Sequence, residues 1–410
     1  MRSRWFWPFL AALVAVAFGR AVFFDFAPID DHALIYQNLA IRDPSWASVA
    51  NFFTRFDPEL YIPLTYLSYF VDHLVFGAEP WAFHLHNLVL HGVNALLVGT
   101  LLWKLSGSRL LSAICALLFA VHPLHTEAVV WIAARKDLLS AFFALLAVFC
   151  VLHAEEGGRS RWMVAAFAAF LLGLLAKVSI AGLPLILLFL TRSVRKTAPF
   201  LIASIVFAIV AIVGKAEVIA SVALLQRLFL TLYGMGAVVL RMIVPIDMAV
   251  MYALPEPSGA SVLVALLPLV LLPLAFFLRR SMPLVAFGVA WMLVTLLPPA
   301  LNAQSDALAA GATFAADRYG YLPSVGLLIV LAGMCLHAMQ RADDRSRSIA
   351  CWVIAAFAAA LASLFIFLAR AQVGTWSDQK LLFMHAILVT PSSADAHVSL
   401  ARILRREGKH

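Results

Sequence analysis

Long apolar stretches separated by short polar stretches dominate the first 370 residues of the chain. A helix of about 20 apolar residues crosses the hydrocarbon core of a bilayer, and the backbone must satisfy its own hydrogen bonds there. Each long stretch therefore predicts a membrane-spanning helix, and we expect an all-α polytopic membrane protein with about 11–13 spans. The stretches lie near 5–24, 84–104, 108–122, 138–153, 161–176, 179–191, 198–214, 228–245, 260–278, 283–298, 322–338 and 348–369.

Basic residues mark the loops on one side of the predicted bundle. Short cytoplasmic loops carry an excess of lysine and arginine, which predicts a cytoplasmic N-terminus and a non-cytoplasmic C-terminus. The first apolar stretch is long and no clean small-residue cleavage site follows it, so we interpret it as an uncleaved span rather than a signal peptide. The basic segments contain Arg2/Arg4, Arg159/Arg161, Arg192/Arg195/Lys196, Arg279/Arg280 and Arg341/Arg345/Arg347.

One part of the chain conflicts with this topology. If every later stretch is a span, the loop with Arg279 and Arg280 falls on the wrong side, so one change of side must lie between about 198 and 260. Charged residues interrupt the segment 215–247, which predicts a re-entrant or interfacial element, or two short spans. These residues are Lys215, Glu217, Arg227 and Arg241.

The segment 25–80 forms the first predicted outer loop. It holds only two basic residues, Arg42 and Arg55, against eight acids: Asp25, Asp30, Asp31, Asp43, Asp57, Glu59, Asp72 and Glu79. Aromatic positions at helical spacing within 46–56 share one face, which predicts a helix lying flat in the membrane interface, and 64–76 resembles it. The shared face holds Trp46, Val49, Phe52, Phe53 and Phe56.

The composition changes after residue 370. Small and apolar residues recur at helical spacing after Pro391, and the segment ends near Gly408. This pattern is typical of one tetratricopeptide-like helix-turn-helix unit. We therefore divide the chain into a transmembrane domain, 1–370, and a short helical tail, 371–410.

Composition excludes a water-soluble enzyme. Hydrophobic residues make up 63% and charged residues 13% of the chain, whereas soluble domains carry about 25% charged residues. The net charge of +8 is divided among short loops, so it reports topology rather than binding to nucleic acid. The four cysteines lie inside apolar stretches without paired spacing, which indicates core residues rather than disulfides or a zinc site.

Adjacent acids follow the first span closely. Asp30 and Asp31 lie at the predicted outer surface, where a carboxylate can act as a general base toward an incoming hydroxyl group. The alternative is a hydrated pair of loop acids that only marks topology. Position alone favours that alternative.

Seven of the twelve histidines lie between His32 and His125. His84 and His91 share one face of the second span, and His122-Pro-Leu-His125-Thr-Glu127 ends the third. Two histidines three residues apart can bind a metal with Glu127, but the proline disturbs the helical spacing and we expect no metal. The alternatives are hydrogen bonds to a sugar or phosphate, and packed histidines bonded to the backbone.

Cations stand at the same predicted outer ends. Arg135 and Lys136 open the fourth span, and Lys177 lies between two apolar stretches. Arg318 is flanked by Tyr319 and followed by Tyr321. These cations can hold a phosphate, or they can anchor the helices at the headgroups beside a belt of aromatic residues.

The order of these motifs resembles the transmembrane and tetratricopeptide-repeat O-mannosyltransferase-like family, whose members have the polytopic GT-C glycosyltransferase fold. The specific parts are His122-Pro-Leu-His125-Thr-Glu127-Ala and Asp317-Arg318-Tyr319-Gly-Tyr321-Leu-Pro-Ser. The match also includes Asp30-Asp31, Tyr61-Ile-Pro-Leu-Thr65, Phe83-His84-Leu-His-Asn87 with His91, and Ala134-Arg135-Lys136-Asp-Leu-Leu139.

The resemblance implies transfer of a sugar from a polyprenyl-phosphate-linked donor to a hydroxyl group of a protein or glycolipid acceptor. Asp30 matches the first-loop acid of the family and would be the base, with Asp31 as a near-equal candidate. The donor and its phosphate would be held by His84, His91, His122, His125, Glu127, Arg135, Lys136, Lys177, Arg318, Tyr319 and Tyr321. The chain departs from the family at Ile62, where a basic residue is common, and at Val178, where an acid is common.

We therefore expect an inverting GT-C glycosyltransferase in a bacterial inner membrane, with its site facing the periplasm and without a cofactor. A transporter or flippase of lipid-linked sugars is one alternative, but a transporter would place its charges at mid-membrane. A non-catalytic membrane scaffold is the other, and the short tail argues against it.

Overall fold

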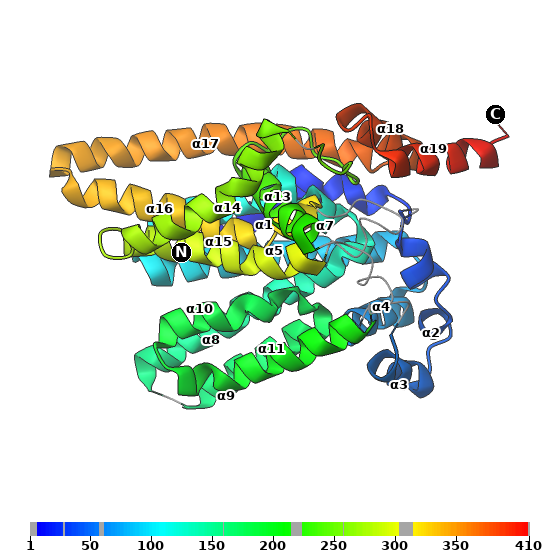
Figure 1. The fold of residues 1–410 in the computed structure, drawn as a ribbon, viewed down its shortest axis with the longest axis horizontal. Helices are drawn as coiled ribbons and strands as arrows, with labels where there is room; N and C mark the ends of the chain where they lie inside the picture. Colours follow the sequence, from blue (N-terminus) through cyan, green and yellow to red (C-terminus); the bar gives the residue numbers. More distant parts are fainter. Residues whose placement is uncertain are drawn as a thin grey trace.

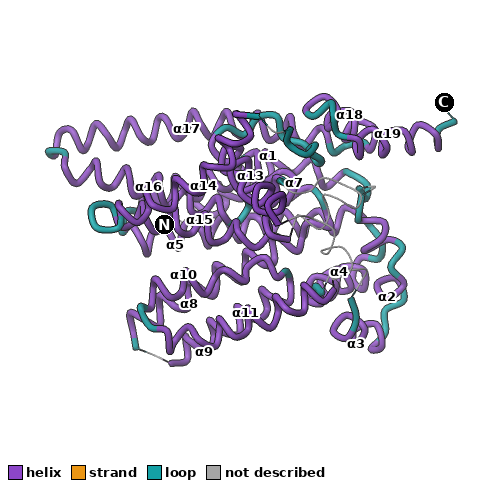
Figure 2. Tube along the Cα trace, in the orientation of Figure 1, coloured by secondary structure: helices purple, strands orange, loops and turns teal. Residues whose placement is uncertain are grey.

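The computed structural model describes residues 6–27, 29–56, 61–158, 160–214, 224–256, 258–302 and 315–408. Throughout these residues the chain forms helices and connecting loops, and Figure 2 shows no strand among them. The predicted all-α architecture is confirmed. Predicted features at 1–4, Asp57, Glu59, Arg159, Lys215 and Glu217 lie outside the described residues.

Nine helices in the described part of the chain are long and apolar enough to cross a membrane. Most of them run along the longest axis of the molecule, and α17 forms one edge of the bundle (Figure 1). The protein is therefore an integral membrane protein with multiple spans. The helices are α1 (Phe6–Phe18) with η1 (Gly19–Phe23), α5 (Pro80–Ser106), η4 (Ile132–Ala134) with α8 (Arg135–Gly157), α11 (Val194–Gly214), α13 (Leu224–Ile243), α14 (Gly259–Leu278), α15 (Pro283–Asn302), α16 (Pro323–Arg341) and α17 (Asp344–Thr375).

Bent and shorter helices account for the difference from the predicted number of spans. α6 (Arg109–Val121) and the segment Pro123–Val130 form a further span only as a pair bent by 48°. The bend lies at Pro123, because proline disfavours the helical conformation of the preceding residue. α9 (Ser160–Ala176) and the segment Val178–Thr191 are shorter apolar helices. If these two also cross the membrane, the described chain reaches the predicted 11–13 spans.

Glycines bring α15 and α16 into close contact. A Cβ atom at Gly288 would lie 2.6 Å from the carbonyl oxygen of Gly326, and one at Gly326 would lie 2.5 Å from that of Gly288. Small residues allow helix backbones to approach in this way inside membranes. The contact fixes the first turn of α16, which follows η6 (Asp317–Gly320) closely.

The basic loops lie together at one end of the bundle, on the left in Figure 1. α11 begins in one of these loops and α14 ends in another. The chain between them therefore starts and finishes at the opposite end, in agreement with the change of side predicted between 198 and 260. α13 is one continuous helix, so the predicted alternative of two short spans is wrong for Leu224–Ile243.

The first outer loop forms short helices at the end opposite the basic loops (Figure 1). They are η2 (His32–Tyr36), α2 (Leu39–Arg42), α3 (Trp46–Thr54) and α4 (Pro63–Phe76). Phe52 stacks on Tyr66 with ring centroids 5.6 Å apart, whereas Trp46 is 89% exposed. The predicted helices of this loop are confirmed, and the contact of α3 with the membrane interface stays a prediction.

The tail lies at the same end as the first outer loop (Figure 1). α18 (Gln379–Val389) and α19 (Ala394–Arg406) pack against each other, and His385 Nε2 lies 2.9 Å from the carbonyl oxygen of Met248. Two packed helices were predicted here, and their assignment to a tetratricopeptide-like unit stays a prediction. α17 extends past the predicted boundary at residue 370.

Candidate functional site

Three cations meet where several helices begin, at the end of the bundle opposite the basic loops. Lys136 lies in the first turn of α8, Arg318 lies in η6, and Lys177 connects α9 to η5 (Val178–Gly182). α8 and α16 both start at this end and finish at the basic loops. We call Lys136, Lys177 and Arg318 the cation cluster.

Aromatic rings support the cation cluster. The Arg318 guanidinium lies 4.9 Å and the Lys136 ammonium 5.5 Å from the ring centroid of Trp131. The ring of Tyr319 lies 5.1 Å from Arg318 and 5.5 Å from Lys177. Because the face of an aromatic ring attracts cations, Trp131 and Tyr319 help to hold three like charges close to one another.

Carboxylates neutralise the cation cluster only in part. Lys177 Nζ lies 2.5 Å from Asp137 Oδ1, and burial lowers the pKa of Lys177 to about 8, against the opposing charge of Asp137. Arg318 forms an ion pair with Glu127, whose Oε2 also accepts the backbone N–H of Arg318 at 2.8 Å. Lys136 makes no hydrogen bond or ion pair with another described residue. Lys136 is therefore the cation of the cluster without a direct carboxylate partner among the described residues, and the charge of Asp30 acts on it.

Asp31 joins the first outer loop to the start of α8. Its Oδ2 accepts the N–H of Ala27 and its Oδ1 accepts the N–H of Ala133, both at 2.8 Å. The side chain is fully buried, and burial raises the pKa of Asp31 to about 7 although both hydrogen bonds lower it. Both carboxylate oxygens are occupied, so Asp31 acts in this structure as a structural acid.

Asp30 lies beside Asp31 and is partly exposed. Its charge acts on Asp31 and on the Lys136 ammonium. The first-loop acid therefore lies within electrostatic range of Lys136 in the cation cluster, and its role as a base stays a prediction. Of the two predicted bases, Asp30 is the one with an accessible side chain.

Arg135 does not join the cation cluster. Its guanidinium donates to Asn87 Oδ1 at 2.8 Å, to Asp72 Oδ2 at 2.5 Å and to the carbonyl oxygen of Phe83 at 2.9 Å. It also lies 4.7 Å from the ring of Tyr69, and its side chain is 0% exposed. This geometry corrects the predicted phosphate-binding role: Arg135 is a structural cation that holds α4 and α5 to α8.

Three of the predicted histidines are also structural. His91 contacts Tyr321 Oη at 2.8 Å and the carbonyl oxygen of Ala120 at 3.1 Å. His122 contacts the carbonyl oxygen of Met242 at 3.0 Å and accepts the N–H of Leu124. The predicted alternative of packed, backbone-bonded histidines describes these rings, and their role as donor ligands has no support in the geometry.

His125 is the third of these histidines, and His84 differs from them. His125 contacts the carbonyl oxygen of Phe119 at 2.9 Å and Ser324 Oγ at 3.0 Å. His84 is buried, and its ring nitrogens make no hydrogen bond with a described residue. No group of three His, Cys, Asp or Glu side chains within the described ranges could hold a metal ion.

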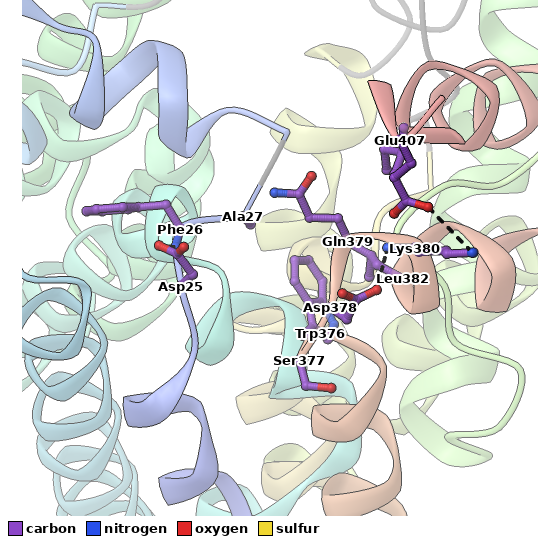
Figure 3. A pocket seen from close by; sticks show the side chains of 11 residues that line it. Asp25, Phe26, Ala27, Trp376, Ser377, Asp378, Gln379, Lys380, Leu382 and Glu407 are labelled. Carbon is purple, nitrogen blue, oxygen red and sulfur yellow. Dashed lines mark hydrogen bonds and ion pairs between the residues drawn. The ribbon is translucent and has the colours of Figure 1, made fainter. Parts of the chain in front are cut away.

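One cavity adjoins the cation cluster, and a second lies between the first outer loop and the tail. A cavity of about 20 Å³ lies among Asp137, Ser179, Thr295, Arg318 and Tyr319. A larger cavity of about 290 Å³ lies between the first outer loop and the tail. Figure 3 shows Asp25 and Phe26 on one side of it, opposite Trp376, Asp378 and Gln379, with the Lys380–Glu407 ion pair on the tail side.

Two residues that line the larger cavity contact residues of the candidate site. Ala27, which lines the cavity, donates its N–H to Asp31. Trp376, which also lines it, lies 6.1 Å from Trp131 between ring centroids. This cavity is therefore linked to Asp31 through Ala27, and to the ring that supports Lys136 and Arg318 through Trp376.

Several site residues were not predicted as such from the sequence. Asp137 was a recognisable candidate, because it follows Arg135 and Lys136 directly. Nothing in its local sequence distinguishes Trp131 as the ring under two cations. Arg241 forms an ion pair with Asp317 at 2.7 Å, and the sequence showed only that it interrupts an apolar stretch. The other site residues that were not predicted are Asp72 and Asn87, which accept hydrogen bonds from Arg135.

Comparison with known proteins gives partial matches. No protein-family model matches the chain. Human and mouse protein O-mannosyl-transferase TMTC2 are 31% identical over 134 residues, which cover 29% of this chain and 16% of the relative. Human TMTC4 is 33% identical over 150 residues, covering 30% of this chain and 20% of the relative. Xenopus laevis tmtc2 is 45% identical over 69 residues, covering 17% of this chain and 8% of the relative.

The chain is similar to the TMTC O-mannosyl-transferases. The matched segments span no more than 20% of the length of these three relatives, so the resemblance predicted from the motifs is confirmed as distant and partial. Among solved structures, ArnT from Cupriavidus metallidurans bound to undecaprenyl phosphate has a TM-score of 0.41 and 15% identity, over 98% of this chain and 76% of that chain.

Proposed function

We propose that this protein is a membrane glycosyltransferase that moves a sugar from a polyprenyl-phosphate-linked donor to an acceptor hydroxyl group. The observation that carries the proposal is that the charge of Asp30 acts on Lys136, which belongs to a cluster of three cations at one end of a membrane-spanning bundle. The TMTC relatives are named as O-mannosyl-transferases, which makes mannose the first sugar to test.

The cation cluster supports binding of the donor phosphate. A polyprenyl phosphate carries its negative charge where the lipid meets the membrane surface, and the cluster lies at helix ends. Departure of the sugar leaves additional charge on the phosphate oxygen. Preorganised cations in a site with little water stabilise that charge in the transition state.

Asp30 is the proposed general base. The acceptor oxygen attacks the anomeric carbon and forms the new C–O bond, the bond between that carbon and the phosphate oxygen breaks, and the acceptor proton passes to Asp30. Attack opposite the leaving group inverts the anomeric centre. Asp31 holds Asp30 in place, because its own oxygens bind Ala27 and Ala133.

The larger cavity is the proposed approach for the acceptor. It lies outside the spans and has polar and charged walls from the first outer loop and the tail, so a hydroxyl-bearing acceptor, a protein or a glycolipid, can reach Asp30 from it. With the positive-inside rule, this end of the molecule faces away from the cytoplasm. We place the protein in a bacterial inner membrane with this end in the periplasm.

The test compares three acids of the first outer loop. Asp30→Asn should reduce transfer from radiolabelled polyprenyl-phosphate mannose in vesicles by about 10²–10⁴-fold, the usual contribution of a general base. Asp43→Asn is the matched control, because Asp43 is exposed and lies in the same loop, and it should retain full transfer. Asp31→Asn should lower the unfolding temperature in addition to transfer.

Other outcomes would reject the proposal. Full transfer by Asp30→Asn removes the assigned base. Movement of the labelled donor across vesicles by an Asp30→Asn/Asp31→Asn protein, without transfer by the unaltered protein, favours a transporter of lipid-linked sugars.

A further inference from the structure

The small cavity beside the cation cluster has walls from four separate parts of the chain. Asp137 and Ser140 come from α8, Ser179 from η5, Thr295 from α15 and Arg318 from η6. Its volume of about 20 Å³ suits one water molecule or one hydroxyl group. A phosphate group or an acetamido group is too large for it.

Two atoms in the walls have no hydrogen-bond partner among the described residues. One oxygen of Asp137, Oδ1, binds Lys177, but Oδ2 is unpaired. Arg318 uses Nη1 and its backbone N–H for Glu127, but Nε is unpaired. Asp137 and Arg318 are each only 8% exposed. A buried unpaired polar atom costs about 1–3 kcal/mol, and more for a charged group, so both atoms call for a partner.

Three of the hydroxyl groups in the walls already have partners. Thr295 Oγ1 donates to the carbonyl oxygen of Trp291 at 2.7 Å, and Ser140 Oγ donates to that of Asp137 at 3.1 Å. Tyr321 Oη contacts His91 at 2.8 Å and Asn94 at 3.2 Å. Among the fully buried polar atoms of the described walls, one acceptor, Asp137 Oδ2, and one donor, Arg318 Nε, are therefore unpaired.

A hydroxyl group matches this pair. Its O–H donates to the carboxylate oxygen and its oxygen accepts the Arg318 N–H, whereas a phosphate oxygen would meet the Asp137 carboxylate with like charge. We infer that this cavity is a specificity subsite that binds one hydroxyl group of the donor sugar. The inference rests on the proposed transfer reaction, and it assigns to Asp137 and Arg318 the selection of an unsubstituted hexose.

The experiment uses donors that lack single hydroxyl groups. Polyprenyl-phosphate mannose, glucose and galactose are first offered to the full-length protein in vesicles. For the hexose that it transfers, the 2-, 3-, 4- and 6-deoxy donors are compared by kcat/KM. One deoxy donor should lose about 10²–10⁴-fold, because two hydrogen bonds to charged groups are lost and the buried atoms remain unpaired.

Two variants connect that loss to the cavity. In Asp137→Asn, which removes the acceptor oxygen, and in Arg318→Lys, which keeps the charge but has no Nε–H, the same deoxy donor should lose less than about threefold relative to its parent. Ser112→Ala is the control, because Ser112 is buried in α6 and donates only to Ser108 within its helix. It should keep the full loss.

The outcomes separate the two proposals. Transfer of all deoxy donors within about threefold of the parent, or an unchanged loss in both variants, overturns the subsite and leaves the transferase intact. Absence of transfer from every parent donor overturns the proposed function and the subsite together. If one variant fails to fold, the other decides the result.

Discussion

Two consecutive cations, Arg135 and Lys136, have opposite surroundings. Arg135 is fully buried and donates to a carboxylate, a side-chain amide and a backbone carbonyl. Lys136 lies over Trp131, without an ion pair to any other residue that the structure describes. A cation with all its partners stabilises the fold, whereas a cation short of partners is available to a ligand. The chain places one of each at the start of α8.

The largest expected effect is the loss of stability when Arg135 is replaced. Arg135→Met leaves the buried Asp72 carboxylate with only its contact to His86 and should lower the free energy of unfolding by about 3–5 kcal/mol. Denaturant titration in detergent measures the change. Arg195→Met, at an exposed position in the first turn of α11, should stay within about 0.5 kcal/mol of the unaltered protein. A similarly small change for Arg135→Met would contradict its structural role.

Substitution of Lys136 should change the rate of transfer rather than the stability. Lys136→Met should reduce kcat/KM for transfer from polyprenyl-phosphate mannose by about 10²–10³-fold, the usual effect of losing one group that stabilises developing charge. Its free energy of unfolding should change by less than about 1 kcal/mol, because no hydrogen bond is lost. Loss of stability without a specific loss of transfer would show that Lys136, like Arg135, is a structural cation.

Lys177 should make the transfer reaction dependent on pH, because its charge is lost near physiological pH. Since burial lowers its pKa to about 8, the cation is lost as the pH rises through 8, and transfer should fall by about tenfold per pH unit above that value if the charged form is required. Lys177→Arg should remove this alkaline decline, because arginine stays charged. An unchanged pH profile in Lys177→Arg would exclude Lys177 as its origin.

Stability should change with pH in the opposite direction. Between pH 8 and the usual lysine pKa of 10.5, the unfolded chain keeps a proton that the folded chain has released. The free energy of unfolding therefore rises with pH in this window. Melting temperatures of the unaltered protein and of Lys177→Arg, measured across the same pH range, check the sign.

The smallest effect is expected at the larger cavity. Asp25→Asn should change KM for the acceptor by about two- to fivefold, as expected for one solvent-exposed hydrogen bond, and should leave KM for the donor unchanged. Asp43→Asn again serves as the control. A change in donor KM alone would show that the acceptor does not use this cavity.

The sequence predicted the helices well but not the partners of their polar residues. The apolar stretch 283–298 became α15, Pro283–Asn302, and 348–369 became α17, Asp344–Thr375, because the requirement to satisfy the backbone inside a bilayer acts on each segment alone. From the sequence alone, Arg135, Lys136 and Arg318 were equally good candidates for phosphate ligands. Only the positions of Asp72 and Asn87 on α4 and α5 separate Arg135 from the other two.

The same limit applies to the histidines and the first-loop acids. The motif His122-Pro-Leu-His125 predicted ligands, yet both rings bind backbone or side-chain oxygens of the core. Asp30 and Asp31 were indistinguishable as neighbours in the chain. The hydrogen bond from Ala133 occupies Asp31, whereas Asp30 stays partly exposed.

The sequence by itself determined that the chain crosses a membrane many times, which end of the bundle carries the basic loops, and which residues could perform chemistry. These properties depend on hydrophobicity and charge, which each segment has before it meets another. The tertiary structure alone decided which polar groups are satisfied and which remain available. A hydrogen bond needs two atoms at one place, and in this protein the second atom usually belongs to a helix far away in the chain.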